Sequence, residues 1–234
     1  MTLFSSVGSA QALDGREAGL QAAHQALNRM GVNAPGLALV ISSHQYQARE
    51  VLSGVSSLLG EIPMLGFSSP AGFTQEGQTP HSVVVALISG DFQAETMWFP
   101  GYAQSGRETA TKVAQHAAAR VERQSLLFFA DGFNGDAEQF CSAVTPGLHI
   151  TGGLSSGDLH TGNTYQMAGT QTGTGGLVAA FSAWEYKNRN WVRSRLGPGG
   201  KPVSCDTFSR LLAAYIGRPS CIRNLCRTFW LPCT

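Results

Sequence analysis

The sequence predicts an α/β fold, of the α+β kind, in which helices flank a mixed β-sheet. Apolar runs such as Leu37–Ile41 and Ser82–Gly90 are typical of strands buried on both faces. Other segments, such as Asp14–Met30, carry apolar residues at helical spacing. With 43% hydrophobic residues in 234, the chain can form the core of one large domain or two small ones.

The N-terminal third alternates strand and helix. Asp14 and Glu17 form a capping-box pattern at the start of the first helix, and Gly31 can end that helix. We expect strands at Leu3–Ser9 and Leu37–Ile41 and a second helix at Gln45–Leu59.

The middle of the chain adds a strand at Ser82–Gly90, preceded by a polar loop at Phe73–His81. Gly90 and Asp91 form a turn signal before the alternating segment Phe92–Phe99, so we expect the two strands to pair as a hairpin. Helices are then expected at Ser105–Gln124 and Asp136–Val144, and strands at Leu126–Ala130, Tyr165–Ala168 and Gly176–Phe181.

Three strands run out into polar loops that contain glycine, at Gly66–Gly72, Asp131–Gly135 and Gly152–Asp158. Ligands of α/β proteins often bind where strands end, because glycine lets the backbone approach a ligand closely. If these ends share one edge, they form a single pocket. The candidate ligand-binding residues are Gly66, Ser68, Ser69, Gly72, His81, Asp131, Asn134, Gly152, Gly153, Ser155, Gly157 and Asp158.

Several of these residues have a purely structural alternative. His81 precedes a strong strand and is typical of a strand-entry residue. Asp131 can cap the turn through Asn134 and Gly135 instead of meeting a ligand.

A serine-dependent hydrolase or amidase is the competing function class. Its nucleophile would be Ser68 or Ser69, and a nucleophilic serine needs a base within hydrogen-bond reach, for which His81 and His149 are candidates. The segment GFSSPAG does not match the G-x-S-x-G elbow, so we expect binding without catalysis.

No cofactor or metal is expected. The glycine- and threonine-bearing segment 170–176 lacks the G-K-[ST] of a phosphate loop. Cys141 lies in a short predicted helix and is expected to be a small core residue. The remaining cysteines contain no C-x2-C pair and have no histidine among them, which argues against zinc: Cys205, Cys221, Cys226 and Cys233.

The charge distribution divides the chain in two. Up to Ala183 there are 7 Lys+Arg and 13 Asp+Glu, whereas from Trp184 onward there are 9 and 2. The acidic first part argues against a nucleic-acid partner, and the basic, aromatic-bearing tail leaves nucleic-acid binding as a third alternative. The sequence has no apolar run of 18 residues and no signal-peptide pattern, so we expect no membrane span and a cytoplasmic location.

The order LALVIS, PMLGFSSPAGF, SVVVALISG, LLFFADGFNGD and HITGGLSSGD resembles the N-terminal part of the FIST domain, a bacterial and archaeal sensory module. The resemblance covers residues 1–182. It implies small-ligand binding, with amino acids as the candidate class, and signal transduction to output proteins that remain to be identified. This chain departs from the family pattern at Phe67, Pro70 and Phe73, where a small residue, no proline and an acid are usual.

Family members continue with a C-terminal FIST region (FIST C), which residues 183–234 do not resemble, so an incomplete FIST module is expected. Codons permitted for residues 184–191, read one base onward, can encode GNIKIGIG, which alternates as a strand does. The sequence therefore predicts a sensing domain at 1–182 and a truncated, frameshifted or disordered tail at 183–234.

Overall fold

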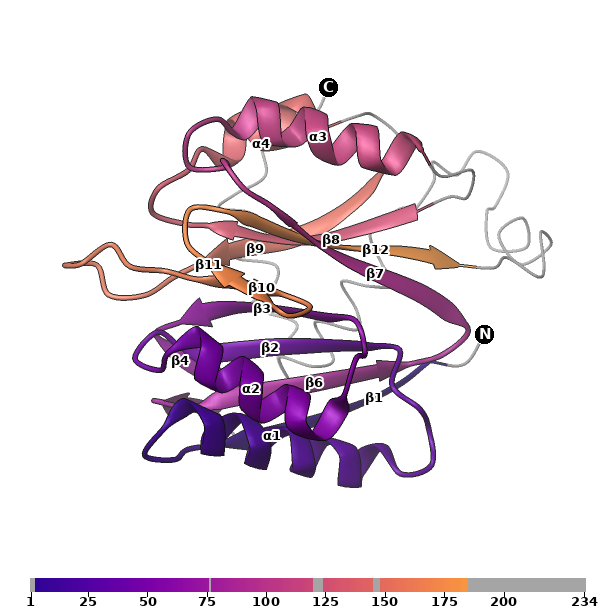
Figure 1. The fold of residues 1–234 in the computed structure, drawn as a ribbon, viewed down its shortest axis with the longest axis vertical. Helices are drawn as coiled ribbons and strands as arrows, with labels where there is room; N and C mark the ends of the chain where they lie inside the picture. The colour runs from indigo at the N-terminus through magenta and orange to yellow at the C-terminus, as the bar shows by residue number, and fades with distance from the viewer. Residues whose placement is uncertain (1–2, 76, 120–123, 145–147, 185–234) are drawn as a thin grey trace, which may run out of the picture.

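Two β-sheets lie face to face, and each carries a pair of helices on its outer side (Figure 1). The computed structural model describes residues 3–75, 77–119, 124–144 and 148–184. The arrangement confirms the predicted α/β class. In chain order the elements are β1 (Phe4–Ala10), α1 (Gly15–Met30), β2 (Leu37–Ser43), α2 (Ala48–Leu59), β3 (Met64–Ser69), β4 (Ala71–Thr74), β5 (Gly77–Pro80), β6 (Val83–Ser89), β7 (Phe92–Phe99), α3 (Gly106–Ala118), β8 (Gln124–Asp131), α4 (Ala137–Ala143), β9 (His149–Ser155), β10 (Gln166–Ala168), β11 (Gln171–Gly173) and β12 (Leu177–Trp184).

Both large sheets are mixed in strand direction. The first has the order β1-β6-β2-β3-β10-β11, and the second has the order β7-β12-β8-β9. Only the β2–β3 and β8–β9 pairs among these described strands are parallel. The short strands β4 and β5 form a separate two-stranded sheet.

Side-chain caps explain where three of the helices begin. Asp14 accepts a 2.8 Å hydrogen bond from the Glu17 backbone N–H at the start of α1. The Ser105 hydroxyl caps α3 and the Asp136 carboxylate caps α4 in the same way. Of the predicted capping box, the Asp14 half is therefore present, while the Glu17 carboxylate accepts a hydrogen bond from Gln21.

Some predicted boundaries are wrong. Helix α2 begins at Ala48, three residues later than expected, and α3 ends at Ala118, well before Gln124, which begins β8. The segment Phe73–His81, expected as a loop, contains most of the β4–β5 hairpin.

The predicted hairpin between Ser82–Gly90 and Phe92–Phe99 is also wrong. Strand β6 pairs with β1 on one side and β2 on the other, so neither of its edges is available to β7. The chain instead crosses at Gly90 and Asp91 into the second sheet, where β7 pairs with β12. A turn signal shows that the chain reverses, but it does not show which sheet receives the next strand.

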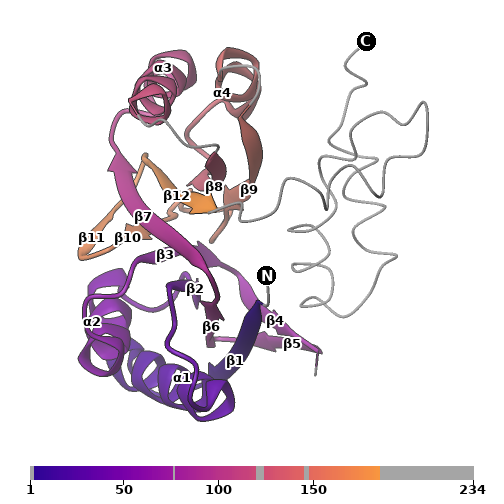
Figure 2. The same cartoon turned by 90° about the vertical axis from the view of Figure 1, so that its right-hand side faces the viewer.

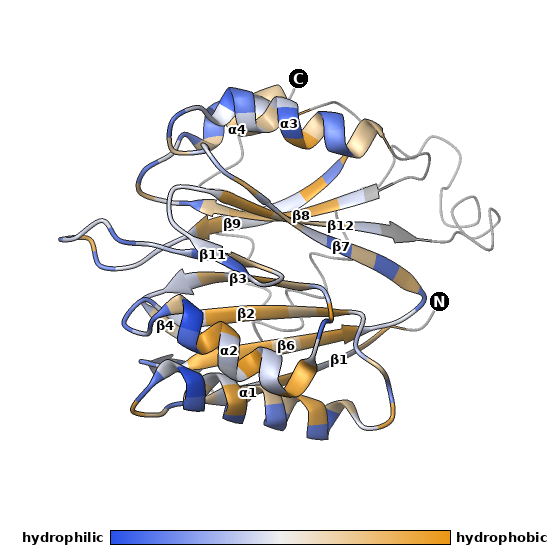
Figure 3. Cartoon of the chain, in the orientation of Figure 1, coloured by the Kyte–Doolittle hydropathy of each residue, from blue (hydrophilic) through white to orange (hydrophobic). Residues whose placement is uncertain are grey.

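Three layers of apolar side chains fill the sandwich. Val85 and Leu87 of β6 face α1 and α2, whereas Ile88 faces the second sheet. Phe129 and Val178 meet Ile88 between the sheets. Figure 3 shows the apolar strands inside and the polar helix faces outside. Burial on both faces explains why these strands read as continuous apolar runs.

In the part of the chain that the structure describes, no helix is long and apolar enough to cross a membrane. Strand β12 extends to Trp184, so order continues slightly past the predicted domain end at residue 182. The interpretation of the tail concerns residues that, from 185 onward, lie outside the described ranges, and it stays a prediction.

Candidate functional site

The structure brings the ends of β3, β8 and β9 together where the two sheets meet. Ser68, at the end of β3, is fully buried. Its hydroxyl donates to the Ser156 carbonyl at 2.9 Å and accepts from the Tyr165 N–H at 3.0 Å. Its backbone N–H and carbonyl bond to the same two residues, each at 2.9 Å. Ser68 therefore joins the first sheet to the loop that follows β9.

Asp131 ends β8 and is fully buried. Its carboxylate accepts hydrogen bonds from the backbone N–H groups of Phe133, Asn134 and Gly175 and from the Asn134 side-chain amide, at 2.9 to 3.2 Å. Burial alone would raise the pKa of Asp131. Hydrogen bonds from Phe133, Asn134 and Thr164 outweigh burial and lower this pKa below its ordinary value. The predicted turn-capping role of Asp131 is therefore present.

A buried amide, which the sequence analysis missed, completes this junction. Gln166 of β10 is fully buried, and its amide nitrogen donates to Ser155 Oγ at 2.6 Å and to Thr164 Oγ1 at 3.2 Å. The Ser155 hydroxyl in turn donates to the Ala130 carbonyl at 3.1 Å. The buried polar groups of this junction are thus paired with one another. The sequence offers no signal for Gln166, because a single glutamine between apolar residues resembles a solvent-facing strand position.

Four of the predicted glycines allow close packing of protein on protein. A Cβ at Gly66 would lie 2.6 Å from Met167 Cε, and one at Gly72 would lie 2.5 Å from Ser82 Oγ. Gly152 and Gly157 have no room for a side chain either, because a Cβ there would overlap a backbone carbonyl of a neighbouring segment. By contrast, Gly153 has only ordinary contacts, with the Phe129 ring.

The remaining predicted residues lie around the junction. The Ser69 hydroxyl donates to the Ala71 carbonyl at 2.8 Å, and Asp158 accepts from the His160 N–H at 2.9 Å. His81 has a φ of 47° and stacks on Tyr46, with ring centroids 4.2 Å apart. This placement agrees with its alternative role as the residue that enters β6.

The geometry does not assemble a serine nucleophile from the predicted residues. Ser68 and Ser69 both donate to backbone carbonyls, and in the described ranges neither hydroxyl bonds to an imidazole. His149 starts β9, at the opposite end of that strand from Ser155. The side chain of His44, which the sequence analysis missed, lies beside Gly157, and its buried Nδ1 has no hydrogen-bond partner among the described residues.

Tyr165, also missed, ties the junction to β2. Its hydroxyl donates to the Ser43 carbonyl at 2.8 Å and lies 2.9 Å from Ser42 Oγ. Burial raises the pKa of Tyr165 to about 12, although the contact with Ser42 lowers it in part.

A hollow of about 410 Å³ lies next to the Asp131 network, between the starts of α3 and α4. Of the predicted residues, Asn134 lines it. The other lining residues come from the segments just before and within the first turns of these helices: Tyr102, Ala103, Gln104, Ser105, Gly106, Phe133, Gly135, Asp136 and Gln139.

Tyr102 is the unusual member of this set. It is fully buried, and its hydroxyl has no hydrogen-bond partner among the described residues. Burial raises the pKa of Tyr102 well above its ordinary value, and the nearby Cys141 and Asp136 add to the rise. Gly135 lies so close that a Cβ there would overlap the Tyr102 ring.

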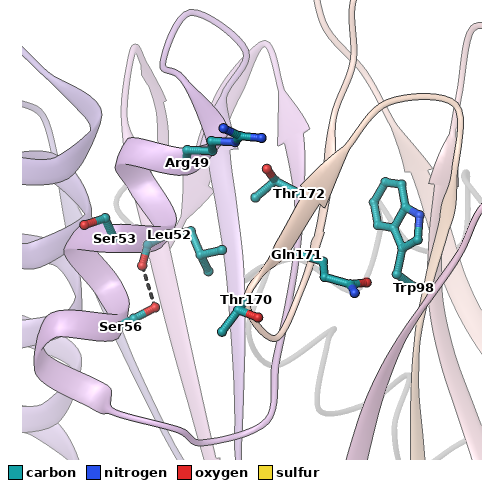
Figure 4. Close-up of a pocket in the computed structure, with 8 residues that line it drawn as sticks. All are labelled: Arg49, Leu52, Ser53, Ser56, Trp98, Thr170, Gln171 and Thr172. Atoms are coloured by element: carbon teal, nitrogen blue, oxygen red, sulfur yellow. Dashed lines mark hydrogen bonds between the residues drawn. The ribbon is translucent and has the colours of Figure 1, made fainter.

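A second hollow, of about 720 Å³, lies between α2 and the β10–β11 turn (Figure 4). None of the predicted ligand-binding residues lines it. Its walls are Arg49, Leu52, Ser53, Ser56, Trp98, Thr170, Gln171 and Thr172.

A family model matches more than half of the chain. Residues 36–194 match the model described as the FIST N domain. Uncharacterized proteins of Mycobacterium bovis and Mycobacterium tuberculosis are each 27% identical over 179 residues, which is 74% of this chain and 45% of the relative. The chain thus spans about half the length of these relatives.

A crystal structure of cyanuric acid hydrolase from A. caulinodans aligns with a TM-score of 0.38 and 14% identity, over 79% of this chain and 72% of that one. A likeness this weak supports no inference about fold or activity.

Proposed function

Because the chain belongs to the FIST N domain family, which is associated with sensing in signal transduction, we propose that it binds a small ligand and passes the signal to an output protein. We further propose a cytoplasmic location and binding without catalysis. The single observation that carries the binding proposal is that Tyr102, one of the residues lining the hollow at α3 and α4, has a buried hydroxyl with no hydrogen-bond partner among the described residues. Buried hydroxyl groups normally have one.

The surroundings of the hollow suggest how a ligand is held. The Asn134 amide nitrogen donates to Asp131 and to the Gly162 carbonyl, at 3.1 to 3.3 Å. With its nitrogen engaged, the Asn134 amide presents its oxygen as a hydrogen-bond acceptor. In this proposal Asn134 contacts the ligand, and Asp131 positions Asn134.

The mixture of groups fits a small zwitterion such as an α-amino acid. The Asp136 carboxylate and the Asn134 oxygen can accept hydrogen bonds from an ammonium group. The Tyr102 hydroxyl and the side-chain amides of Gln104 and Gln139 can donate to a carboxylate. The start of the 13-residue helix α3 also favours negative charge. A volume of about 410 Å³ is ample for a ligand of this size.

The other predicted residues then have a structural role and do not contact the ligand. We propose that Ser68, Ser155 and the glycines of β3 and β9 hold the junction against which the Asp131 turn rests. Their hydroxyl and backbone groups already bond to protein, which favours a structural role over direct ligand contact.

The test is ligand-dependent thermal unfolding across the amino acids, followed by calorimetry on any that raises the midpoint. A ligand at 100 times its Kd adds about 2.7 kcal/mol of stability. Asp136→Asn keeps a good helix cap but removes the charge, so we expect it to weaken binding by roughly 1.5–3 kcal/mol.

The matched control is Asp14→Asn, the same change at the cap of α1, which is expected to leave affinity unchanged. If no amino acid shifts the midpoint, or if both variants weaken binding alike, the hollow is not the site. Turnover of an ester that is lost in Ser69→Ala would favour the hydrolase instead.

A further inference from the structure

The two halves of the described chain repeat one structural plan. Each half runs strand, helix, strand, helix, strand, short hairpin, strand. The first half builds the order β1-β6-β2-β3, and the second builds β7-β12-β8-β9, with parallel and antiparallel pairs in the same places. In this scheme β3 corresponds to β9, and the β4–β5 hairpin corresponds to β10–β11.

The repeat holds at the level of single hydrogen bonds. Ser43, the last residue of β2, donates its N–H to the Ser82 carbonyl at 2.9 Å. Asp131, the last residue of β8, donates its N–H to the Gly176 carbonyl at 3.1 Å. Ser43 and Asp131 therefore occupy equivalent positions at the end of the second strand of their halves, and each bonds to the residue just before the start of the last strand.

A pair of glycines confirms the register. Gly66 of β3 pairs with Val40, and a Cβ on it would lie 2.7 Å from the Val40 carbonyl oxygen. Gly152 of β9 pairs with Phe128, and a Cβ on it would overlap the Phe128 carbonyl oxygen. Both halves thus need a glycine at the same point of the third strand.

The halves differ in what covers this third strand. The outer edge of β3 is covered by β10, which pairs antiparallel with residues 65–67. The outer edge of β9 has no strand beside it in the described ranges, because β9 ends its sheet. The β4–β5 hairpin, the counterpart of the element that covers β3, likewise pairs with no further strand there. Among the described strands, the second half therefore has a third strand that no hairpin covers, and the first half has a hairpin that covers no third strand.

Backbone N–H and carbonyl groups on the outer edge of β9 point toward the place where a pairing strand would lie. In β3, the N–H and carbonyl of Ser68 bond outward to Tyr165 and Ser156. The shared register makes Leu154 the counterpart of Ser68, so its backbone groups point away from β8. Leu154 and Phe73, on β9 and β4, also expose large apolar side chains, which are 43% and 53% exposed. Unpaired strand edges with apolar side chains favour pairing with another chain.

We propose that the outer edge of β9 is an interaction surface for the β4–β5 hairpin of a second copy of this chain, so that β4 pairs with β9 as β10 pairs with β3. The contact is head-to-tail, because each molecule offers the hairpin on one unit and the edge on the other (Figure 2). Such a contact builds a ring or an open chain of copies rather than a two-fold dimer.

The test is the mass of the 234-residue chain in solution, measured by light scattering over a concentration series. The wild-type chain is expected to associate with itself. Phe73→Lys on the hairpin and Leu154→Lys on the edge should each weaken association by about tenfold or more. Val32→Lys is the matched control, since Val32 is fully exposed in the loop after α1 and lies on neither surface.

Mixing the two interface variants separates head-to-tail pairing from other modes. Each keeps one intact surface, so an equimolar mixture should form a one-to-one pair that stops at two chains. A monomeric wild-type chain, or association that Leu154→Lys leaves unchanged, would overturn the proposal. So would a mixture that stays monomeric while Val32→Lys associates normally.

Discussion

The hydroxyl groups of Tyr102 and Tyr165 lie in different surroundings, so the same substitution by phenylalanine should have opposite effects on stability at the two positions. Tyr102 is fully buried with a hydroxyl that has no partner among the described residues. Tyr165 has a hydroxyl that donates to the Ser43 carbonyl at 2.8 Å. Replacing either residue by phenylalanine removes one oxygen and keeps the ring. For Tyr102, the ring contact with Phe140, at 6.2 Å between centroids, is retained.

The two variants should change the free energy of unfolding with opposite signs. A buried hydroxyl without a partner costs roughly 1–3 kcal/mol, so Tyr102→Phe is expected to stabilise the free protein by about 1 kcal/mol. Tyr165→Phe removes the shortest hydrogen bond to the Ser43 carbonyl and should destabilise by about 1 kcal/mol. That carbonyl keeps the Tyr46 N–H and the Ser42 hydroxyl as donors, at 3.1 and 3.3 Å. For a domain of this size, each kcal/mol moves the unfolding midpoint by about 2–4 °C.

The assay is urea and thermal unfolding of the two variants beside the wild-type chain, with and without an amino acid that binds. With ligand, Tyr102→Phe should gain less stability than wild type, because its hydroxyl is a proposed ligand contact. If Tyr102→Phe destabilises the free protein as much as Tyr165→Phe, the hydroxyl already has a partner, and the argument for the hollow fails.

Alkaline unfolding provides a second readout for Tyr165. Its folded pKa of about 12 lies above the ordinary value of 10.0. The stability that this raised pKa contributes is therefore present below pH 10 and is lost as pH rises from 10 to 12. Tyr165→Phe should lack this loss.

Three further predictions follow. Because its pKa is lowered, the Asp131 carboxylate stabilises the fold above the ordinary carboxyl pKa of 3.8, and this stability is lost as pH falls through the folded pKa. Asp131→Asn should therefore lower the free energy of unfolding at pH 7 and make that free energy depend less on pH in acid. Gly54→Ala should destabilise by roughly 2 kcal/mol or more, because its Cβ would overlap the Arg16 carbonyl of α1, whereas Ser53→Ala on the exposed side of α2 should change stability by less than about 0.5 kcal/mol. If the tail is out of frame, deleting residues 185–234 should leave the unfolding midpoint unchanged and resequencing codons 182–184 should find an inserted or deleted base; a lower midpoint or an intact frame shared by close relatives would refute that hypothesis.

Elements with local signals were predictable from the sequence. Asp14, Ser105 and Asp136 mark the starts of their helices because a capping side chain acts on a backbone N–H only three residues away. Buried strands such as β2 and β6 were visible as apolar runs because both of their faces are covered. The sheet that receives β7 was not visible, since that choice depends on strands far along the chain.

The site was predictable only in outline. Three strand ends with glycine and serine do meet. The residues that complete their junction are Tyr165, just before β10, and Gln166, its first residue, and this segment carries no such signal. Tyr102 was not predicted as a site residue, for a different reason. A tyrosine in a loop is expected at the surface, and only the fold shows that this hydroxyl is buried with no partner in the part of the chain that the structure describes.

The internal repeat was hidden because equivalent positions keep their geometry and not their side chains. Ser43 corresponds to Asp131, and Ser68 corresponds to Leu154, so the two halves share a hydrogen-bond register without sharing a motif. Gly66 and Gly152 are the same residue in both halves because there the backbone itself excludes a side chain. In such a repeat, the residue type must match only where a side chain would overlap the backbone of a neighbouring strand. At other positions the two halves can carry different side chains. That freedom permits one half to hold Asp131 beside a hollow while the other half presents an exposed hairpin.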